Sequence, residues 1–383
     1  MGFGNDVQMK VYQRQEVNMV PVNFEQLEAE AKQRLDAKPY DYVAASAGRE
    51  VTAGDNQRAF DKWKIIPRML RDTSERDLSV ELFGTKLNYP IMCAPVGVQS
   101  VVHEEGELAS ARAASAMGVP FISSTASTYS LEKTAKEMGQ GDKWFQLYWS
   151  NDREIAGSMV KRAERAGYQA IVVTLDTSMM GWREKDIEHA YLPFLQAEGM
   201  GNYLADPVFC ARLGHAPEED MRAAIMLWVQ IFGDPSLTWD DLAFIKSQTS
   251  LPILLKGVLH PEDAKLAVEH GVDGIIVSNH GGRQVDGAIA SIEALPHIAD
   301  VVQDDVPLLM DSGIRRGSDI MKALALGARA VCIGRPYMYG LALAGEEGVQ
   351  QVLRNLIADF DLTMALSGQS SVEGIHRGLL TTS

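Results

Sequence analysis

The stretch Gly274-Ile-Ile-Val-Ser-Asn279 decides the fold class, because its apolar residues follow one another without the polar–apolar alternation of a half-exposed strand. A strand of this kind is buried on both faces, which is typical of a parallel sheet covered by helices. Seven more runs of strand length share the pattern, at 89–97, 120–126, 144–149, 170–176, 252–258, 306–312 and 330–336. Together they indicate eight buried parallel strands.

Helix signals lie between these runs. The segments 104–117, 152–166, 261–270 and 318–326 each have acidic residues near the start and a glycine directly after the end, which is typical of helix termini. Strand and helix alternating eight times predict an α/β fold of the (β/α)₈ or TIM barrel type. A doubly wound open sheet is the alternative, but its dinucleotide-binding form carries G-x-G-x-x-G after the first strand. This chain has Ala94-Pro-Val-Gly-Val-Gln-Ser100 there.

Residues 1–85 precede the barrel, and we expect them to form a helical segment. Asn23-Phe-Glu-Gln26 resembles a capping box that opens a helix to about Leu35, and a second helix is expected at 40–47. No Pro/Ser-rich linker follows. The segment should therefore pack on a barrel formed by residues 86–383, which also includes C-terminal helices.

One connection is much longer than the others. About 75 residues separate Asp176 from Pro252, and most of the excess, at about 184–237, follows the fourth strand. In a barrel this places the insertion over the C-terminal mouth, where active sites lie, and favours a lid. A surface excursion or an oligomer contact is the alternative.

The composition is that of an ordinary globular protein, with 46% apolar and 23% charged residues among 383. A formal net charge of −15 disfavours nucleic acid and anionic membranes as partners, although a local basic cleft can still hold an anion. Three cysteines without a C-x-x-C pair predict neither a disulfide framework nor a metal site. With no secretory leader and no membrane-spanning apolar run, we expect a cytoplasmic protein.

Polar residues end most of the predicted strands, and in a barrel these positions carry function. Buried charges are costly unless they are paired or used, so a purely structural role for the whole set is disfavoured. The residues are Gln146, Tyr148, Thr174, Asp176, Lys256, Asn279, His280, Asp311, Arg315, Gly334 and Arg335.

Two loops resemble a phosphate cradle. They are Asp311-Ser-Gly-Ile-Arg-Arg-Gly317 after the seventh strand and Ile333-Gly-Arg-Pro336 after the eighth. Barrels commonly hold phosphate at this pair of loops, through backbone N–H groups and a helix N-terminus, and arginines add charge. Alternatively, Gly313 and Gly334 are only turn glycines.

The segment Ser278-Asn-His-Gly-Gly-Arg-Gln284 resembles the signature of the FMN-dependent α-hydroxy-acid oxidising enzymes. The resemblance extends from about Phe24 to about Gly374. Its supporting motifs are Ala94-Pro95, Phe145-Gln-Leu-Tyr148, Thr174-Leu-Asp176, Leu255-Lys-Gly257, Asp311-Ser-Gly313 and Gly334-Arg-Pro336.

The resemblance implies FMN as the cofactor. Its phosphate would lie on Gly313, Arg315, Gly334 and Arg335. Its ring would be bonded by Ser124, Gln146 and Thr174, with Lys256 at the pyrimidine end and Asp311 on the ribityl chain. The remaining implied cofactor contacts are Pro95, Val96, Gly97 and Ser278.

The resemblance also implies a 2-hydroxy carboxylate substrate. Arg183 and Arg283 would bind its carboxylate, while Tyr42 and Tyr148 would supply hydroxyl donors. His280 would be the general base, with a near-neutral intrinsic pKa suited to that role. Asp176 would orient the imidazole and stabilise its cationic form. The implied catalytic group is His280, Asp176, Tyr148 and Arg283.

Gly97 leaves extra space beside the reactive flavin nitrogen, and Ala126 stands where other members have a large aromatic residue. Gly181-Trp-Arg183 and the long insertion are similar to those of lactate 2-monooxygenases. This favours oxidation of L-lactate with O₂ to acetate, CO₂ and water, since a lid that slows product release favours decarboxylation. The alternatives are an oxidase that releases pyruvate and hydrogen peroxide, a dehydrogenase with another acceptor, and a non-catalytic flavin-binding barrel. A homotetramer or homo-octamer is implied.

Overall fold

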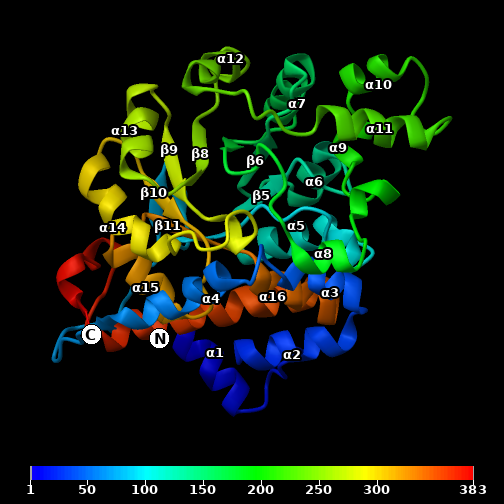
Figure 1. The fold of residues 1–383 in the computed structure, drawn as a ribbon. Helices are drawn as coiled ribbons and strands as arrows, with labels where there is room; N and C mark the ends of the chain where they lie inside the picture. The colour runs from blue at the N-terminus through cyan, green and yellow to red at the C-terminus, as the bar shows by residue number, and fades with distance from the viewer. Residues whose placement is uncertain (1, 383) are drawn as a thin grey trace.

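Eight parallel strands close into a barrel at the centre of the molecule (Figure 1). The structure is a computed structural model that describes residues 2–382. The strands are β4 (Ile91–Cys93), β5 (Phe121–Ser124), β6 (Lys143–Tyr148), β7 (Ile171–Thr174), β8 (Ile253–Val258), β9 (Gly274–Val277), β10 (Leu308–Met310) and β11 (Ala330–Ile333). Each lies within one of the eight predicted runs or begins one residue before it, and β11 closes the ring against β4. The predicted (β/α)₈ barrel is confirmed.

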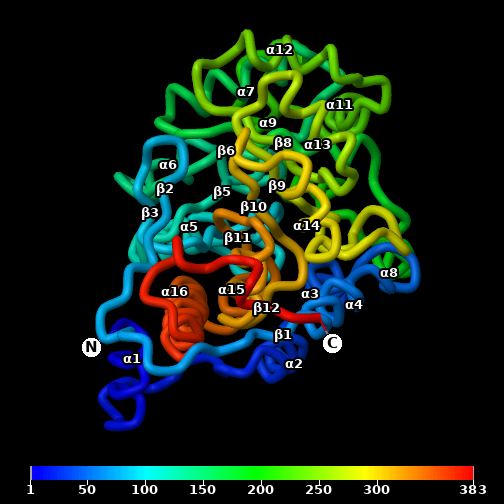
Figure 2. Tube along the Cα trace, turned by 90° about the vertical axis from the view of Figure 1, so that its left-hand side faces the viewer, coloured from blue at the N-terminus to red at the C-terminus, as the bar shows by residue number. Residues whose placement is uncertain are grey.

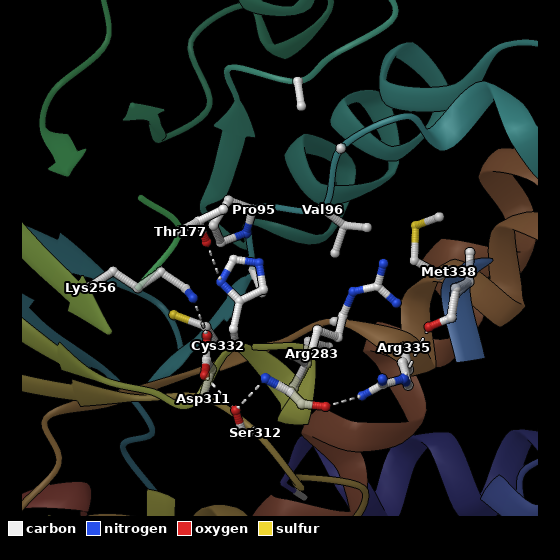
Figure 3. A pocket seen from close by; sticks show the side chains of 18 of the residues that line it. Pro95, Val96, Thr177, Lys256, Arg283, Asp311, Ser312, Cys332, Arg335 and Met338 are labelled. Atoms are coloured by element: carbon white, nitrogen blue, oxygen red, sulfur yellow. Dashed lines mark hydrogen bonds and ion pairs between the residues drawn. The ribbon is translucent and has the colours of Figure 1, made fainter. Parts of the chain in front are cut away.

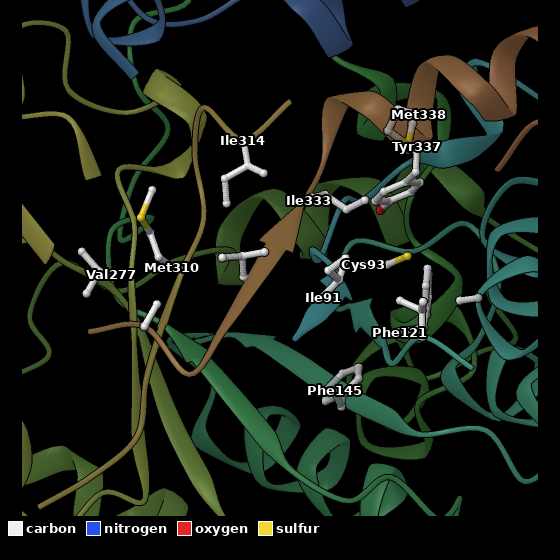
Figure 4. Close-up of a cluster of buried hydrophobic side chains, with 14 of the residues drawn as sticks. Ile91, Cys93, Phe121, Phe145, Val277, Met310, Ile314, Ile333, Tyr337 and Met338 are labelled. Atoms are coloured by element: carbon white, nitrogen blue, oxygen red, sulfur yellow. The ribbon is translucent and has the colours of Figure 1, made fainter. Parts of the chain in front are cut away.

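Both faces of the strands are buried, which explains why their sequences do not alternate. Ile122, Trp144 and Leu254 point inward and belong to a core cluster inside the barrel. Phe121 and Phe145, one residue away, point outward into the larger core beneath the helices (Figure 4). Residues that face the barrel interior and residues that face the helices therefore both have to be apolar over most of each strand.

Helices surround the barrel, and the four whose bounds were predicted begin and end within two residues of the prediction. Asp152 caps one of them by accepting hydrogen bonds from the N–H groups of Glu154 and Ile155, and Gly118 ends another with φ +63°. The helices of the ring are α5 (Gly106–Met117), α6 (Leu131–Met138), α7 (Arg153–Arg165), α12 (Leu242–Lys246), α13 (Pro261–Glu269), α14 (Ser291–Val302), α15 (Gly317–Ala325) and α16 (Arg335–Leu366).

The N-terminal segment packs along α16, as the blue and orange ribbons show in Figure 1. Its helices are α1 (Phe3–Tyr12), α2 (Phe24–Arg34), α3 (Ala37–Ala44) and α4 (Val51–Arg58). The predicted cap is present, since the Asn23 side chain accepts from the N–H of Gln26. The helix expected at 40–47 begins earlier, because Pro39 lies in its first turn, where a missing N–H does no harm.

The same segment is not wholly helical, contrary to the prediction. The strand β1 (Trp63–Ile65) pairs antiparallel with β12 (Leu380–Thr382), next to the C-terminus (Figure 2). A hairpin of β2 (Val80–Leu82) and β3 (Thr85–Leu87) places Val80, Leu82 and Leu87 in the interior cluster. The hairpin directly precedes β4, so it covers the end of the barrel where the strands begin.

The insertion after β7 folds into short helices, drawn in green in Figure 1. They are α8 (Glu184–Glu188), η3 (Pro193–Gln196), α9 (Gly201–Leu204), α10 (Pro207–Leu213) and α11 (Met221–Ile231). Between residues 2 and 382, no helix is both long and apolar enough to cross a bilayer.

Candidate active site at the barrel mouth

Polar side chains line the barrel mouth because they continue the inward-facing parity of the strands. In β5, β6, β7 and β8, the inward apolar residue is followed two positions later by a polar one, and side chains two apart share a face. β9 and β10 continue into Ser278 and Asp311 in the same way. The resulting tier above the apolar core is Ser124, Gln146, Thr174, Lys256, Ser278 and Asp311.

A second tier lies two residues further along the same strands. It contains Tyr148, Asp176 and His280, and it opens into a pocket (Figure 3). In that view Lys256 and Asp311 lie on one side of the pocket, and Arg335 and Met338 lie on the other. The predicted residues that line it are Tyr42, Pro95, Val96, Gly97, Tyr148, Arg183, Lys256, His280, Arg283, Asp311, Gly313, Arg315, Gly334 and Arg335. The buried Ser124, Gln146, Thr174 and Ser278 and the partly buried Asp176 support that lining from below or from the side.

His280 and Asp176 form a hydrogen-bonded pair. Nδ1 of His280 lies 2.8 Å from Oδ1 of Asp176, and Nε2 lies 3.4 Å from the Tyr148 hydroxyl. Burial lowers the pKa of His280, although the Asp176 carboxylate opposes this. Burial alone would raise the pKa of Asp176, but the charges of His280 and Lys256 lower it to about 2. A neutral imidazole beside an ionised carboxylate is the arrangement of a general base.

The backbone at His280 is held in a strained conformation. His280, Gly281 and Gly282 all have positive φ, at +59°, +66° and +78°. The Ser278 hydroxyl accepts from the N–H of His280, and the Ser312 hydroxyl accepts from the N–H of Gly281. Strain of this kind persists only where the surroundings over-determine it, and it is common at functional sites.

Lys256 supplies a buried positive charge at the floor of the pocket. Its Nζ lies 3.2 Å from Oδ2 of Asp311 and donates to the Ser278 hydroxyl at 2.9 Å. Burial would lower the pKa of Lys256, but Asp311 and Asp176 raise it above its ordinary value. The ammonium therefore stays charged and can stabilise negative charge on a bound group.

A chain of uncharged hydrogen bonds crosses the other side of the floor. Ser124 Oγ donates to Gln146 Oε1 at 3.0 Å, and Gln146 Nε2 donates to Thr174 Oγ1 at 2.9 Å. All three residues are at least 95% buried. Such a chain offers oriented donors and acceptors to the edge of a polar heterocycle.

Arginines without a carboxylate partner surround the pocket. Among residues 2–382, no acidic side chain lies within 4.0 Å of the guanidinium groups of Arg283, Arg315 or Arg335. Burial, with the nearby Arg183, lowers the pKa of Arg283 to about 9, and burial, with Arg335, lowers that of Arg315 to about 10. Arg283 lies near His280 with Arg183, whose Nη1 is 3.9 Å from Oδ2 of Asp186. Arg315 and Arg335 form a second pair near the start of α16. Both pairs can bind anions.

The second arginine pair lies at a helix N-terminus. α16 begins at Arg335 after Gly334, which has no capping side chain, and such a terminus attracts phosphate. The loop after β10, residues 311–317, offers fewer free N–H groups to a phosphate than expected. Asp319 already accepts from the N–H groups of Arg315 and Arg316. Gly313 in this loop also meets a steric constraint that is independent of any phosphate. With φ +95°, a Cβ there would lie 2.0 Å from the carbonyl oxygen of Asn56.

The structure reveals several pocket residues that sequence reasoning missed. Thr177 Oγ1 donates to Asp176 Oδ1 at 3.1 Å and lies 3.4 Å from His280 Nδ1. Its position next to Asp176 was the available signal. Phe194 and Phe232 come from the insertion and line the pocket, with Phe232 edge-on to Tyr148. No local pattern places them there. Ala126, by contrast, was marked by the sequence, and it lines the pocket next to Gly97.

Comparison with known proteins gives a consistent result. The profile of the family described as FMN-dependent dehydrogenase matches residues 31–382. An L-lactate oxidase from Lysinibacillus sphaericus is 49% identical over 93% of this chain and 92% of its own length. Glycolate oxidase from Spinacia oleracea is 43% identical over 93% and 94%, respectively. A crystal structure of mandelate oxidase with (S)-4-hydroxymandelic acid superimposes with a TM-score of 0.84, at 38% identity, covering 95% of this chain and 99% of that one.

Proposed function

The chain belongs to the FMN-dependent dehydrogenase family, and we propose that it oxidises a small L-2-hydroxy acid, L-lactate, with O₂ as electron acceptor. Its relatives establish the coarser activity: it is an FMN-dependent oxidoreductase of 2-hydroxy acids. The observation that carries the finer proposal is the His280–Asp176 pair, at 2.8 Å, beside two arginines in a pocket narrowed by aromatic side chains. We further propose that the product is acetate, formed by oxidative decarboxylation.

The residues of the pocket fit FMN. When bound, FMN accepts the two electrons of the substrate and passes them on. Arg315 and Arg335 at the start of α16 suit its phosphate, and the Ser124–Gln146–Thr174 chain suits the polar edge of its ring. Lys256 adds the positive charge that favours an electron-rich ring. Asp311, held by Lys256, offers an acceptor to the ribityl hydroxyls.

The substrate carboxylate would bind to Arg183 and Arg283. Arg183 Nε donates to the carbonyl oxygen of Arg283, which holds the Arg183 side chain next to the backbone of Arg283. Both residues line the pocket. The guanidinium of Arg283 also lies 5.3 Å from the centre of the Tyr42 ring. Binding an anion here offsets the mutual repulsion of the two cations and fixes the α-carbon relative to His280.

His280 would take the proton that the oxidation releases. Its Nε2 faces the Tyr148 hydroxyl, while Nδ1 is occupied by Asp176. A hydroxyl group of the substrate placed between Nε2 and Tyr148 could donate to the imidazole and accept from the phenol. The ionised Asp176 then stabilises the imidazolium that forms.

The insertion limits the side chain of the substrate and excludes water. Phe194 stacks on Trp228 with ring centres 4.3 Å apart, and Trp228 packs on Phe232 at 4.7 Å. Phe194 and Phe232 both line the pocket, and together they form its aromatic wall. An apolar wall close to Tyr148 favours a short, uncharged side chain such as the methyl group of lactate.

Product retention separates the two possible outcomes. If pyruvate leaves before oxygen reacts, the products are pyruvate and hydrogen peroxide. If pyruvate stays, peroxide decarboxylates it, and lactate plus O₂ gives acetate, CO₂ and water. We propose that the aromatic wall favours the second outcome by slowing the release of pyruvate.

The test is product analysis with the purified FMN-loaded enzyme, L-lactate and O₂. We expect one acetate and one CO₂ for each O₂ consumed. One free hydrogen peroxide and one pyruvate for each O₂ would contradict the monooxygenase proposal and leave an oxidase.

A variant tests the role of the wall. Phe232→Ala should increase the fraction of O₂ recovered as free peroxide, because pyruvate can escape. Phe244→Ala is the matched control, since Phe244 lies on α12 under Arg153 and does not line the pocket. Equal peroxide yields from the two variants would refute the retention argument.

We also propose that the protein acts in the cytoplasm as a homotetramer or homo-octamer. Support comes from the family resemblance and from the three cysteines, which are all free thiols, with Cys93 and Cys332 buried.

A further inference from the structure

One short loop connects two parts of the proposed cofactor site: the Ser124–Gln146–Thr174 chain and the Pro95–Gly97 segment. Residues 125–130, which we call the β5–α6 loop, follow directly after Ser124 of the Ser124–Gln146–Thr174 chain. The N–H of Thr125 donates to the Gln146 carbonyl oxygen at 3.0 Å, and the N–H of Val98 donates to the Ala126 carbonyl oxygen at 2.8 Å. The loop thus holds Gln146 on one side and the Pro95–Gly97 segment on the other.

One buried side chain of the insertion forms hydrogen bonds with this loop. Asn202, in α9, is fully buried, and its Nδ2 donates to the carbonyl oxygens of both Ser124 and Thr125, each at 3.0 Å. Its Oδ1 accepts from the N–H of Leu131 at 2.6 Å. One amide group therefore joins the two ends of the loop, at the end of β5 and the start of α6, where backbone groups have no partner in the strand ladder or in the helix.

The backbone around Asn202 fits the loop closely. The N–H of Gly201 donates to the Ser127 carbonyl oxygen, and a Cβ at Gly201 would lie 2.3 Å from the carbonyl oxygen of Thr128. On the other side of the loop, the N–H of Thr128 donates to the buried carboxyl group of Glu107. The loop is therefore clamped between the insertion and α5.

Asn202 is itself anchored to the barrel. Arg162 of α7, which is 8% exposed, donates through Nη1 both to the Asn202 carbonyl oxygen at 2.8 Å and to Asp206 at 3.0 Å. Asp206 is fully buried and also caps α10. This part of the insertion is consequently fixed to the barrel.

We propose that Asn202 is a positioning residue for the flavin site: by binding the Ser124 and Thr125 carbonyl groups, it sets the orientation of the Ser124–Gln146–Thr174 chain and of the Pro95–Gly97 segment. The inference rests on the proposed function, because it takes this chain as the contact of the FMN ring. It gives the insertion a second role, which is to define the environment of the cofactor rather than only to cover the substrate.

The test compares Asn202→Ala with Asn151→Ala. Asn151 is the matched control, because its Nδ2 also bridges barrel and insertion, to the Gln230 carbonyl oxygen at 2.8 Å, but outside the flavin site. We expect Asn202→Ala to weaken FMN binding about tenfold, the value for one to two lost hydrogen bonds, and to shift the visible absorption bands and midpoint potential of bound FMN. Asn151→Ala should leave all three unchanged.

Two further variants separate positioning from general destabilisation. Asn202→Ser keeps one hydroxyl donor and should give an intermediate FMN dissociation constant. The double variant Asn202→Ala/Ser124→Ala should lose less affinity than the product of the single losses, because both act through the same chain. Independent effects, or FMN spectra and affinities equal to those of Asn151→Ala, would overturn the inference.

Failure of the proposed function would look different. In that case wild-type bound FMN would not be reduced by L-lactate, whatever the effect of Asn202. The Asn202 measurements use only FMN binding, spectrum and potential, so they stand apart from turnover.

Discussion

His280 is constrained in both its backbone and its side chain. Its φ of +59° is unusual for a residue with a Cβ. The hydrogen bonds from its N–H to the Ser278 hydroxyl and from Nδ1 to the Asp176 carboxylate keep it in place. Burial lowers its pKa while Asp176 opposes the shift. The result is an imidazole that stays neutral, and able to accept a proton, at neutral pH.

The pH dependence of the reaction follows from these shifts. In the proposed role of His280 the neutral imidazole accepts the proton, and its pKa is lowered from 6.5, so the acid limb of kcat/KM should lie below pH 6.5. Asp176→Asn removes the charge that raises this pKa, so the limb should move to still lower pH. The same change should reduce kcat by about 10²–10⁴-fold, since the imidazolium loses its partner. Steady-state kinetics across pH 5 to 9 measure both effects.

His280→Gln supplies the control for the assignment of the base. It should bind FMN with an unchanged spectrum but show no reduction by substrate in anaerobic stopped-flow experiments. Normal reduction in this variant, or an acid limb that moves to higher pH in Asp176→Asn, would show that another group accepts the proton.

At the scale of elements, the short turn η5 (His280–Gly282) depends on its contact with α4. The Asn56 and Asn279 side chains exchange two hydrogen bonds, at 2.8 and 2.7 Å, and so join α4 to the turn. Gly282 lies so close that a Cβ there would be 2.8 Å from the backbone nitrogen of Ala53. The N-terminal segment therefore holds the turn that contains His280 as well as packing on α16.

Gly282→Ala should accordingly affect both stability and activity. The substitution introduces a Cβ at φ +78°, for which the backbone strain alone costs about 1–3 kcal/mol. The steric clash with Ala53 adds to this, so we expect a larger loss in the free energy of unfolding. The shift of the turn should also lower kcat/KM, because His280 moves with it. Urea denaturation and steady-state kinetics test the two effects.

Gly287→Ala is the matched control. Gly287 has a similar φ of +83°, but a Cβ there would meet nothing within 4 Å. It should show only the backbone penalty and nearly normal kinetics. If both variants lose the same stability and keep full activity, the contact between α4 and the turn does not position His280.

At the scale of the whole molecule, an acidic protein concentrates unpaired positive charge at one place. The net charge is −15, yet Arg283, Arg315 and Arg335 converge on the pocket without carboxylate partners in the described part of the chain. Their mutual repulsion destabilises the protein until anions bind. The cofactor is therefore expected to contribute to stability as well as to chemistry.

Removal of FMN should lower the thermal unfolding temperature. At a free FMN concentration about 100-fold above Kd, binding contributes about 2.7 kcal/mol to stability. Inorganic phosphate should restore part of the loss in the FMN-free protein, and chloride at equal ionic strength should restore less. Thermal denaturation followed by circular dichroism gives the comparison. An Arg315→Ala variant that is stabilised by phosphate as strongly as the wild type would show that the phosphate site lies elsewhere.

The eight strands and their order could be predicted from sequence, because burial on both faces leaves a local record in each strand. The residues His280, Asp176 and Lys256 could be found for a related reason, since strand parity and position after a strand place them at the mouth. The short β2–β3 hairpin and the β1–β12 pair were missed. Each strand there has only three residues, and the β1–β12 pair depends on a partner more than 300 residues away.

Tertiary structure alone decided how the insertion and the N-terminal segment complete the site. The positions of Phe194, Phe232, Asn202 and Asn56 depend on packing between segments that are distant in sequence, and no periodic pattern marks their contacts. The same holds for the unpaired arginines, since only the fold shows which carboxylates stay out of reach. Local periodicity determines which strands form, but the contacts that shape a pocket are long-range and specific to side-chain geometry, so they exist only once the chain has folded.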